Sequence, residues 1–183
     1  MNTIKIIKDG DPVLRTNALD VPVSEITTLK IQKIIKDMSR ALAQERFGVA
    51  IAAPQIGVPL RIFVVAGKVF DKNYGDSEHK SKDKIFINPI ILKTSKRKQE
   101  SHESCLSIQG RPEEYGPDVA GMVERPDKMT IGYYDEVGIK QEYGASSFLS
   151  AIFDHEIDHL NGILFIDKAI DQWEIDKDFN KVN

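Results

Sequence analysis

One short segment carries residues whose types and spacing suit the binding and use of a metal ion. It reads His155-Glu156-Ile157-Asp158-His159 and matches the pattern HExxH. Helical side chains four residues apart lie on the same face, so His155 and His159 can bind one ion. Glu156 lies beside that face, where its carboxylate can take a proton from water at the ion. The alternative is an ordinary buried helix whose histidines form hydrogen bonds.

A catalytic metal ion also needs a third protein ligand and an open position for water. Downstream of the HExxH pattern the sequence offers Glu174 but no further histidine. Upstream, the single cysteine, Cys105, could supply a thiolate, which suits zinc or ferrous iron. A free cysteine is more commonly a small buried hydrophobic residue. Beside an HExxH pattern that lacks a third ligand, we nevertheless expect Cys105 to bind the ion, and His102 to lie on the surface or near the ligands.

A third segment combines small residues with one amide side chain. It runs from Gly48 to Gln55 and reads GVAIAAPQ. Small residues let a backbone approach a ligand closely, and Gln55 offers a neutral amide donor. Taken alone, the same segment could simply be a packed strand that ends in a turn.

Length and composition favour a single domain without a nucleic-acid or membrane function. The chain has 183 residues, of which 41% are hydrophobic, and its charges nearly cancel at −3. This balance argues against an electrostatic surface for nucleic acid or an anionic membrane. One cysteine excludes an internal disulfide, and no apolar run reaches the roughly 18–20 residues of a membrane span. We therefore expect one cytoplasmic domain over residues 1–183, with a polar tail at 168–183.

The pattern of apolar residues and turn formers predicts an α+β fold. Apolar residues at helical spacing predict an N-terminal helix over 24–44, with Ser24 as its N-cap, and a second helix over 148–160, capped by Ser146 or Ser147. Between the helices we expect an exposed loop at 71–84 and an irregular stretch at 110–121. We expect extended segments at 49–53, 62–65, 85–87, 90–92, 129–134 and 139–143. We expect antiparallel strands packed around a central helix that carries the metal ligands.

Taken together, these segments resemble one family, the peptide deformylases. That family has a small-residue segment ending in Gln, a Glu-Gly-Cys-Leu-Ser segment and an HExxH helix, in this order and at similar separations. The likeness covers most of the chain, from Gly10-Asp11-Pro12-Val13-Leu14-Arg15 to residues 162–167. Two positions depart from the pattern: Ala50 and Ser104 stand where the family has glycine.

The resemblance implies a metal-dependent hydrolase that removes the N-formyl group from the initiator methionine of new polypeptides and releases formate. It implies that Cys105, His155 and His159 hold one divalent ion. Ferrous iron is favoured in the cell, with zinc, nickel or cobalt as possible replacements. Its partners would be N-formylmethionyl peptides and nascent chains, with transient proximity to the ribosome.

The resemblance also implies roles for individual residues. Glu156 would accept a proton from the attacking water and deliver it to the leaving amine. The side-chain amide of Gln55 and the backbone N–H of Leu106 would stabilise the negative charge on the formyl oxygen. We expect five residues to bind the substrate, chiefly around the methionine side chain: Val49, Ala50, Phe148, Ala151 and Ile152.

Two other functions are also consistent with the sequence. The departures at Ala50 and Ser104 would also suit a deformylase-like module that binds peptides without catalysis. The HExxH pattern alone would also suit an endopeptidase whose third ligand lies downstream of the helix.

Overall fold

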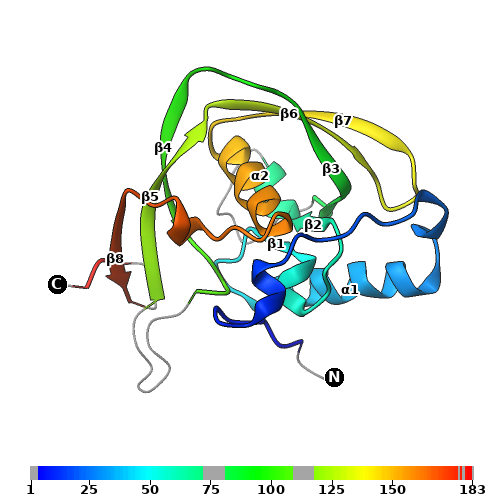
Figure 1. Ribbon diagram of the computed structural model, residues 1–183, viewed down its shortest axis with the longest axis horizontal. Coiled ribbons are helices and arrows are strands. Elements are labelled where there is room, and N and C mark those ends of the chain that lie inside the picture. Colours follow the sequence, from blue (N-terminus) through cyan, green and yellow to red (C-terminus); the bar gives the residue numbers. More distant parts are fainter. Residues whose placement is uncertain (1–3, 72–80, 109–117, 177, 179, 183) are drawn as a thin grey trace.

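The structure, a computed structural model, describes residues 4–71, 81–108, 118–176, 178 and 180–182. Two antiparallel sheets enclose one helix and carry a second on the outside (Figure 1). The larger sheet has the strand order β1-β2-β3-β6-β7, and the smaller has the order β4-β5-β8. The elements are α1 (Leu29–Gln44), β1 (Ala50–Ala52), β2 (Ile62–Val65), β3 (Lys84–Thr94), β4 (Lys98–Ser104), β5 (Asp118–Pro126), β6 (Lys128–Tyr134), β7 (Lys140–Ser146), α2 (Ser147–Leu160) and β8 (Asp171–Ile175).

The two helices pack on opposite faces of the larger sheet. Side chains of a strand alternate between its faces, and β2 shows this directly. Ile62 and Val64 pack in the cluster with α1, whereas Phe63 and Val65 pack in the cluster with α2. Because both faces are buried, β1 and β2 are short, continuous apolar runs without polar alternation.

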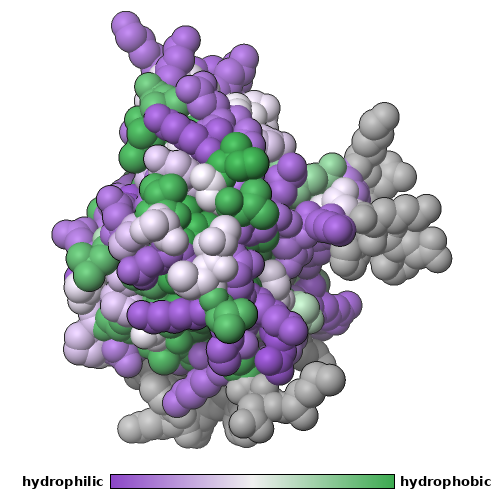
Figure 2. Space-filling model, turned by 90° about the vertical axis from the view of Figure 1, so that its right-hand side faces the viewer, coloured by the Kyte–Doolittle hydropathy of each residue, from purple (hydrophilic) through white to green (hydrophobic). Residues whose placement is uncertain are grey.

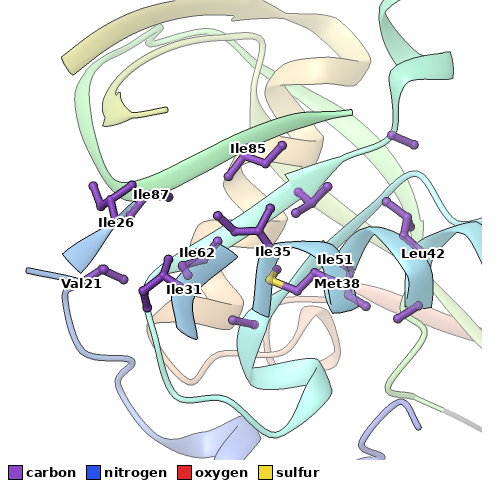
Figure 3. Packing of buried hydrophobic residues seen from close by; sticks show 14 of the residues in the cluster. Val21, Ile26, Ile31, Ile35, Met38, Leu42, Ile51, Ile62, Ile85 and Ile87 are labelled. Atoms are coloured by element: carbon purple, nitrogen blue, oxygen red, sulfur yellow. The ribbon is translucent and has the colours of Figure 1, made fainter. Parts of the chain in front are cut away.

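Helix α1 covers its face of the sheet with one apolar stripe. Ile31, Ile35, Met38 and Leu42 point toward Ile51, Ile62, Ile85 and Ile87 of the sheet (Figure 3). The helix begins at Leu29, so the predicted start at Ser24 was wrong. The Thr28 hydroxyl accepts a hydrogen bond from the Ile31 N–H and caps the first turn, while Val23–Glu25 form a separate 3-10 turn.

Helix α2 lies in the middle of the molecule, with strands of both sheets around it (Figure 1). It starts directly after β7, with Ser146 as its N-cap, and ends at Leu160. Gly162 follows with a φ of +71°, a conformation that glycine adopts without a Cβ penalty. The predicted helix over 148–160 and the α+β class are therefore confirmed.

The strands are longer than the sequence pattern indicated. The segments 85–87 and 90–92 belong to one strand, β3, whose pairing with β6 is irregular between residues 87 and 90. Asn88 lies at that irregularity with a φ of +49°, which explains why the pattern is interrupted there. The predicted hairpin of 129–134 and 139–143 is confirmed as β6 and β7.

The predicted tail and the second irregular stretch both contain strand. Residues 171–175 form β8, which pairs with β5 and buries Ile175. Residues 118–121, expected to be irregular, start β5, because β4 and β8 both pair with them. The predicted loop at 71–84, which includes His79, falls largely outside the described residues, and so do residues 110–117 of the irregular stretch predicted at 110–121.

The surface mixes apolar and hydrophilic side chains. On the face seen in Figure 2, apolar residues lie interspersed among hydrophilic ones. Within the described ranges, neither helix is long and apolar enough to cross a membrane.

The close approach of the chain at Gly162 predicts a measurable cost for any side chain there. A Cβ at Gly162 would lie 2.7 Å from the carbonyl carbon of Arg15, in addition to the cost of the positive φ. We expect Gly162→Ala to lower the free energy of unfolding by about 2–4 kcal/mol, measured by urea denaturation. Gly10→Ala is the control, since Gly10 also has a positive φ, but nothing lies within 4 Å of a Cβ there. It should lose only about 1–2 kcal/mol, and equal losses would contradict the steric argument.

Candidate active site

Three side chains from distant parts of the chain converge at one point beside α2. Cys105 follows the end of β4, while His155 and His159 lie one turn apart on α2. One ligand atom from each residue lies within 4.8 Å of the corresponding atoms of the other two. The Cys105 Sγ lies 3.2 Å from the His159 Nε2. A thiolate and two imidazoles form a donor set that fits a divalent ion such as zinc or iron.

The surroundings of Cys105 favour its thiolate form. Burial raises the pKa of the thiol, but the charges and hydrogen bonds of His159 and His155 outweigh it. The pKa therefore lies well below its ordinary value. The Ser107 N–H also donates to the Cys105 Sγ, at 3.4 Å. A thiolate is the form in which cysteine binds metal ions.

A buried carboxylate fixes the orientation of His155. The His155 Nδ1 lies 2.8 Å from a carboxylate oxygen of Glu103, the residue two positions before Cys105. Since Nδ1 is used in this contact, Nε2 is the nitrogen that remains for an ion. Burial raises the pKa of Glu103, but hydrogen bonds from Arg125 and His155 lower it to about 2. Glu103 is therefore a carboxylate at neutral pH and holds the ring in one orientation.

Arg125 of β5 ties this carboxylate to the helix. Its guanidinium is fully buried and donates two hydrogen bonds of 2.8 Å to Glu103. It also donates to the carboxylates of Asp154 and Asp158 on α2. Asp158 further accepts a hydrogen bond from the Lys168 ammonium. One arginine thus links β4, β5 and α2 directly behind the histidines.

Glu156 has the environment expected of a proton acceptor. Burial raises its pKa to about 7, and the charge of His155 opposes that shift. Its Oε2 atom is buried without a hydrogen-bond partner, as is the His159 Nδ1. Buried polar atoms without partners are rare, and those beside a cluster of ligands point to a missing ion or water.

Gln55 presents its amide N–H₂ to the same point. Its Oε1 accepts the backbone N–H of Ala52 at 2.8 Å, which fixes which end of the amide is the oxygen. The Nε2 lies 3.5 Å from the Cys105 Sγ and donates to the Ser107 hydroxyl at 3.1 Å. The amide is therefore held in place from both ends before any substrate binds.

An N-terminal segment joins the two loops that carry Gln55 and Leu106. The Ile7 N–H donates to the Gln55 carbonyl, and the Asp9 N–H donates to the Ser107 carbonyl, both at 2.8 Å. Between them, the Lys8 ammonium donates to the Leu106 carbonyl at 2.7 Å. These three bonds set the position of one loop relative to the other.

The ligand cluster opens into a cavity of about 670 Å³. Gln55, Leu106, Cys105, His155 and Glu156 all line this cavity. The cavity is also lined by the five residues expected to bind substrate, which are Val49, Ala50, Phe148, Ala151 and Ile152. Of these, Phe148 is half exposed, and Ala50, Ala151 and Ile152 are buried.

The alternative ligands lie elsewhere. His102 precedes Glu103 and therefore points to the opposite face of β4, where its ring packs edge-on against Trp173, with centroids 5.4 Å apart. Glu174 is an exposed residue of β8. Among the described residues, the potential metal-binding group consists of Cys105, His155 and His159 alone.

Sequence reasoning missed four residues that support the site: Lys8, Glu103, Arg125 and Asp158. Glu103 and Asp158 lie within two of the sequence motifs, but roles were predicted only for their neighbours. The spacing of Glu103 and Cys105 at i and i+2 on an extended segment was the available signal for Glu103. Lys8 and Arg125 are distant in sequence from the motifs, and only the fold brings them near.

Comparisons with known proteins agree on one family. The family model described as polypeptide deformylase matches residues 3–174. A peptide deformylase of Halothermothrix orenii is 40% identical, over 93% of this chain and 96% of its own length. One from Prochlorococcus marinus (strain NATL2A) is 34% identical, over 98% of this chain and 80% of its own.

Solved structures give the same result. A Met-Ala-Ser-bound class I type b peptide deformylase of Acinetobacter baumannii has a TM-score of 0.76 and 30% identity, with coverage of 91% of this chain and 98% of that chain. An actinonin complex of a peptide deformylase from Synechococcus elongatus has a TM-score of 0.76 and 31% identity, with coverage of 91% and 80%.

Removing the buried guanidinium should destabilise the whole fold. Arg125→Met leaves the carboxylates of Glu103 and Asp158 buried without their main partner. We expect the free energy of unfolding to fall by about 3–5 kcal/mol, measured by chemical denaturation. The control is Arg97→Met, since the Arg97 side chain is 82% exposed and should contribute less than about 0.5 kcal/mol. Similar losses in the two variants would show that the buried network is not what stabilises the fold.

Neutralising Glu103 should weaken metal binding. In Glu103→Gln the side chain keeps its size but loses the charge that orients His155. We expect affinity for Zn²⁺ to fall by about 10- to 100-fold, measured by competition with a chelator. Glu100→Gln, at an exposed position of the same strand, should bind Zn²⁺ as the unaltered protein does. Unchanged affinity in Glu103→Gln would contradict the orienting role.

Proposed function

Because this chain belongs to the polypeptide deformylase family, we propose that Glu156, Gln55 and Leu106 carry out its reaction beside an ion held by Cys105, His155 and His159. Peptide deformylases are metal-dependent hydrolases, and the reaction they catalyse is removal of the N-formyl group from nascent peptides. The amide C–N bond breaks, formate leaves, and the new chain keeps a free amino group. A module that binds peptides without catalysis is not favoured.

One observation carries the assignment of residues. A thiol and two imidazoles, separated by about 50 residues in sequence, place their ligand atoms within 4.8 Å of one another. Next to them lies a buried glutamate with an oxygen that has no partner. The departures at Ala50 and Ser104 leave every one of these groups in place.

Glu156 is our proposed general base and acid. Cys105, His155 and His159 would hold the divalent ion, which would supply Lewis-acid chemistry and lower the pKa of water from 15.7 toward about 7. The Glu156 Oε2 accepts a proton from the attacking water and later donates it to the leaving nitrogen. A pKa raised by burial suits this task, because the group must both gain and lose the proton near neutral pH.

Gln55 and Leu106 are our proposed donors to the formyl oxygen. Attack on the formyl carbon places negative charge on that oxygen, and donors already fixed in position stabilise it most. The Gln55 Nε2 is aimed into the cavity because Ala52 holds the other end of the amide. The Leu106 N–H follows directly after the ligand Cys105, on a loop held by the N-terminal segment.

Two strand edges provide a place for the peptide backbone. In the described part of the chain, β1 pairs only with β2, and β4 pairs only with β5. Both strands line the cavity, so an extended peptide can bind along a free edge through main-chain hydrogen bonds. We place the methionine side chain among Val49, Phe148 and Ile152, on the side of the cavity formed by α2.

For the ion, we propose ferrous iron in the cell. This choice follows the family resemblance, since two imidazoles and a thiolate suit zinc equally well, and nickel or cobalt are possible replacements. We further propose that the enzyme works in the cytoplasm, near the ribosomes from which formylated chains emerge.

Replacing the proposed base should separate metal binding from turnover. Glu156→Ala removes the carboxylate and leaves all three ligands in place. We expect the variant to retain one metal ion per chain by elemental analysis. Formate release from formyl-Met-Ala-Ser, by anaerobically prepared protein, should fall by about 10²- to 10⁴-fold.

Glu174→Ala is the matched control, because Glu174 is the exposed glutamate downstream of the helix. It should keep both metal content and turnover. Turnover that survives in Glu156→Ala would contradict the assignment of the base. Metal lost from Glu174→Ala would instead favour an endopeptidase-type ligand set.

A further inference from the structure

Lys8 is a charged side chain of the catalytic cavity to which the proposed mechanism gives no part. It lines that cavity together with the proposed catalytic residues. Its ammonium donates a 2.7 Å hydrogen bond to the carbonyl of Leu106, 98 residues away in sequence. A hydrogen bond from a charged donor is roughly twice as strong as one between neutral groups. The bond therefore brings a positive charge to the backbone directly after the ligand Cys105.

The Leu106 carbonyl belongs to the central peptide of a tight turn. The turn runs from Cys105 to Ile108 and is closed by the Ile108 N–H, which donates to the Cys105 carbonyl at 2.9 Å. The N–H of the central peptide is that of Ser107, and it donates to the Cys105 Sγ at 3.4 Å. The carbonyl and the N–H of one trans peptide group point in opposite directions. One peptide thus lies between the Lys8 ammonium on one side and the Cys105 sulfur on the other.

The charge of Lys8 strengthens the hydrogen bond to the sulfur through this peptide. A cation at a carbonyl oxygen draws electron density from the amide, because the C–N bond has partial double-bond character, and the N–H becomes a stronger donor. Hydrogen bonds linked in this way strengthen one another by roughly 10–30% per bond. A thiolate that accepts a stronger hydrogen bond donates less electron density to a bound ion, which leaves the ion a stronger Lewis acid.

We propose that Lys8 is a positioning residue for turnover, which acts on the Cys105 thiolate through the Leu106–Ser107 peptide. This inference rests on the proposed function, since it requires a bound ion and the deformylation reaction. A second donor, the uncharged Gln55 amide, lies 3.5 Å from the same sulfur. The Ser107 N–H lies at a similar distance, and it differs in that a full positive charge is bound to its own peptide group.

The test replaces Lys8 in the cobalt-loaded enzyme. Lys8→Met removes the charge, and the fold should hold because the Ile7 N–H and the Asp9 N–H make their own hydrogen bonds to the neighbouring loops. We expect kcat for formyl-Met-Ala-Ser to fall by about 5- to 20-fold, with KM within about twofold and one cobalt ion per chain retained. The thiolate-to-cobalt charge-transfer band should move to longer wavelength, since a sulfur with a weaker hydrogen bond gives up an electron at lower energy.

Two further variants separate the charge of Lys8 from other effects. Lys8→Arg keeps a charged donor, so kcat should stay within about threefold of the unaltered enzyme and the band should stay in place. Lys5→Met is the matched control, because Lys5 is an exposed lysine of the same segment and does not line the cavity. Its kcat and its absorption band should equal those of the unaltered enzyme.

Three results would overturn the inference alone. They are an unchanged kcat in Lys8→Met, a fall in its kcat without movement of the band, and an equal loss in Lys8→Arg. Failure of the unaltered, cobalt-loaded enzyme to release formate would instead overturn the proposed function, and this role of Lys8 with it.

Discussion

The buried guanidinium of Arg125 is the interaction on which the rest of the site depends. It connects Glu103 on β4 with Asp154 and Asp158 on α2, and so fixes the smaller sheet against the central helix. Glu103 in turn holds the His155 ring. A charge buried this deeply is stable only when its partners are correctly placed, so the network favours one arrangement of sheet and helix. The position of the ligands follows from that arrangement.

The sequence predicted the residues of the motifs better than it predicted the residues that hold them in position. The HExxH spacing placed two histidines on one face of a helix, and the helix begins and ends within a residue of the expected bounds. The family was identified from three ordered motifs and is confirmed. Local patterns carry this information because helix periodicity and motif spacing are local properties. The individual roles of Gln55, Leu106 and the substrate-binding residues remain predictions, although the structure places all of them around one cavity.

What sequence reasoning missed depends on pairing between distant segments. Residues 171–175 read as a polar tail because only Trp173 and Ile175 are large and apolar, and their strand exists through its pairing with β5. No role was predicted for Arg125, because only the approach of β4, β5 and α2 makes it a buried partner of three carboxylates. The start of α1 was missed because Thr28, rather than Ser24, caps its first turn. Such choices between nearby polar residues depend on tertiary packing.

The hydrogen bonds from Ile7, Lys8 and Asp9 to the two segments that carry Gln55 and Leu106 have a consequence for biosynthesis. The site needs a segment near the start of the chain, loops from its middle and a helix near its end, so nearly the whole polypeptide must be synthesised before these parts can assemble. Long-range contacts of this kind form late in folding, and the ion can bind only once its ligands have met. A molecule of this enzyme therefore gains its complete site only after the whole segment from Ile7 to His159 has been synthesised.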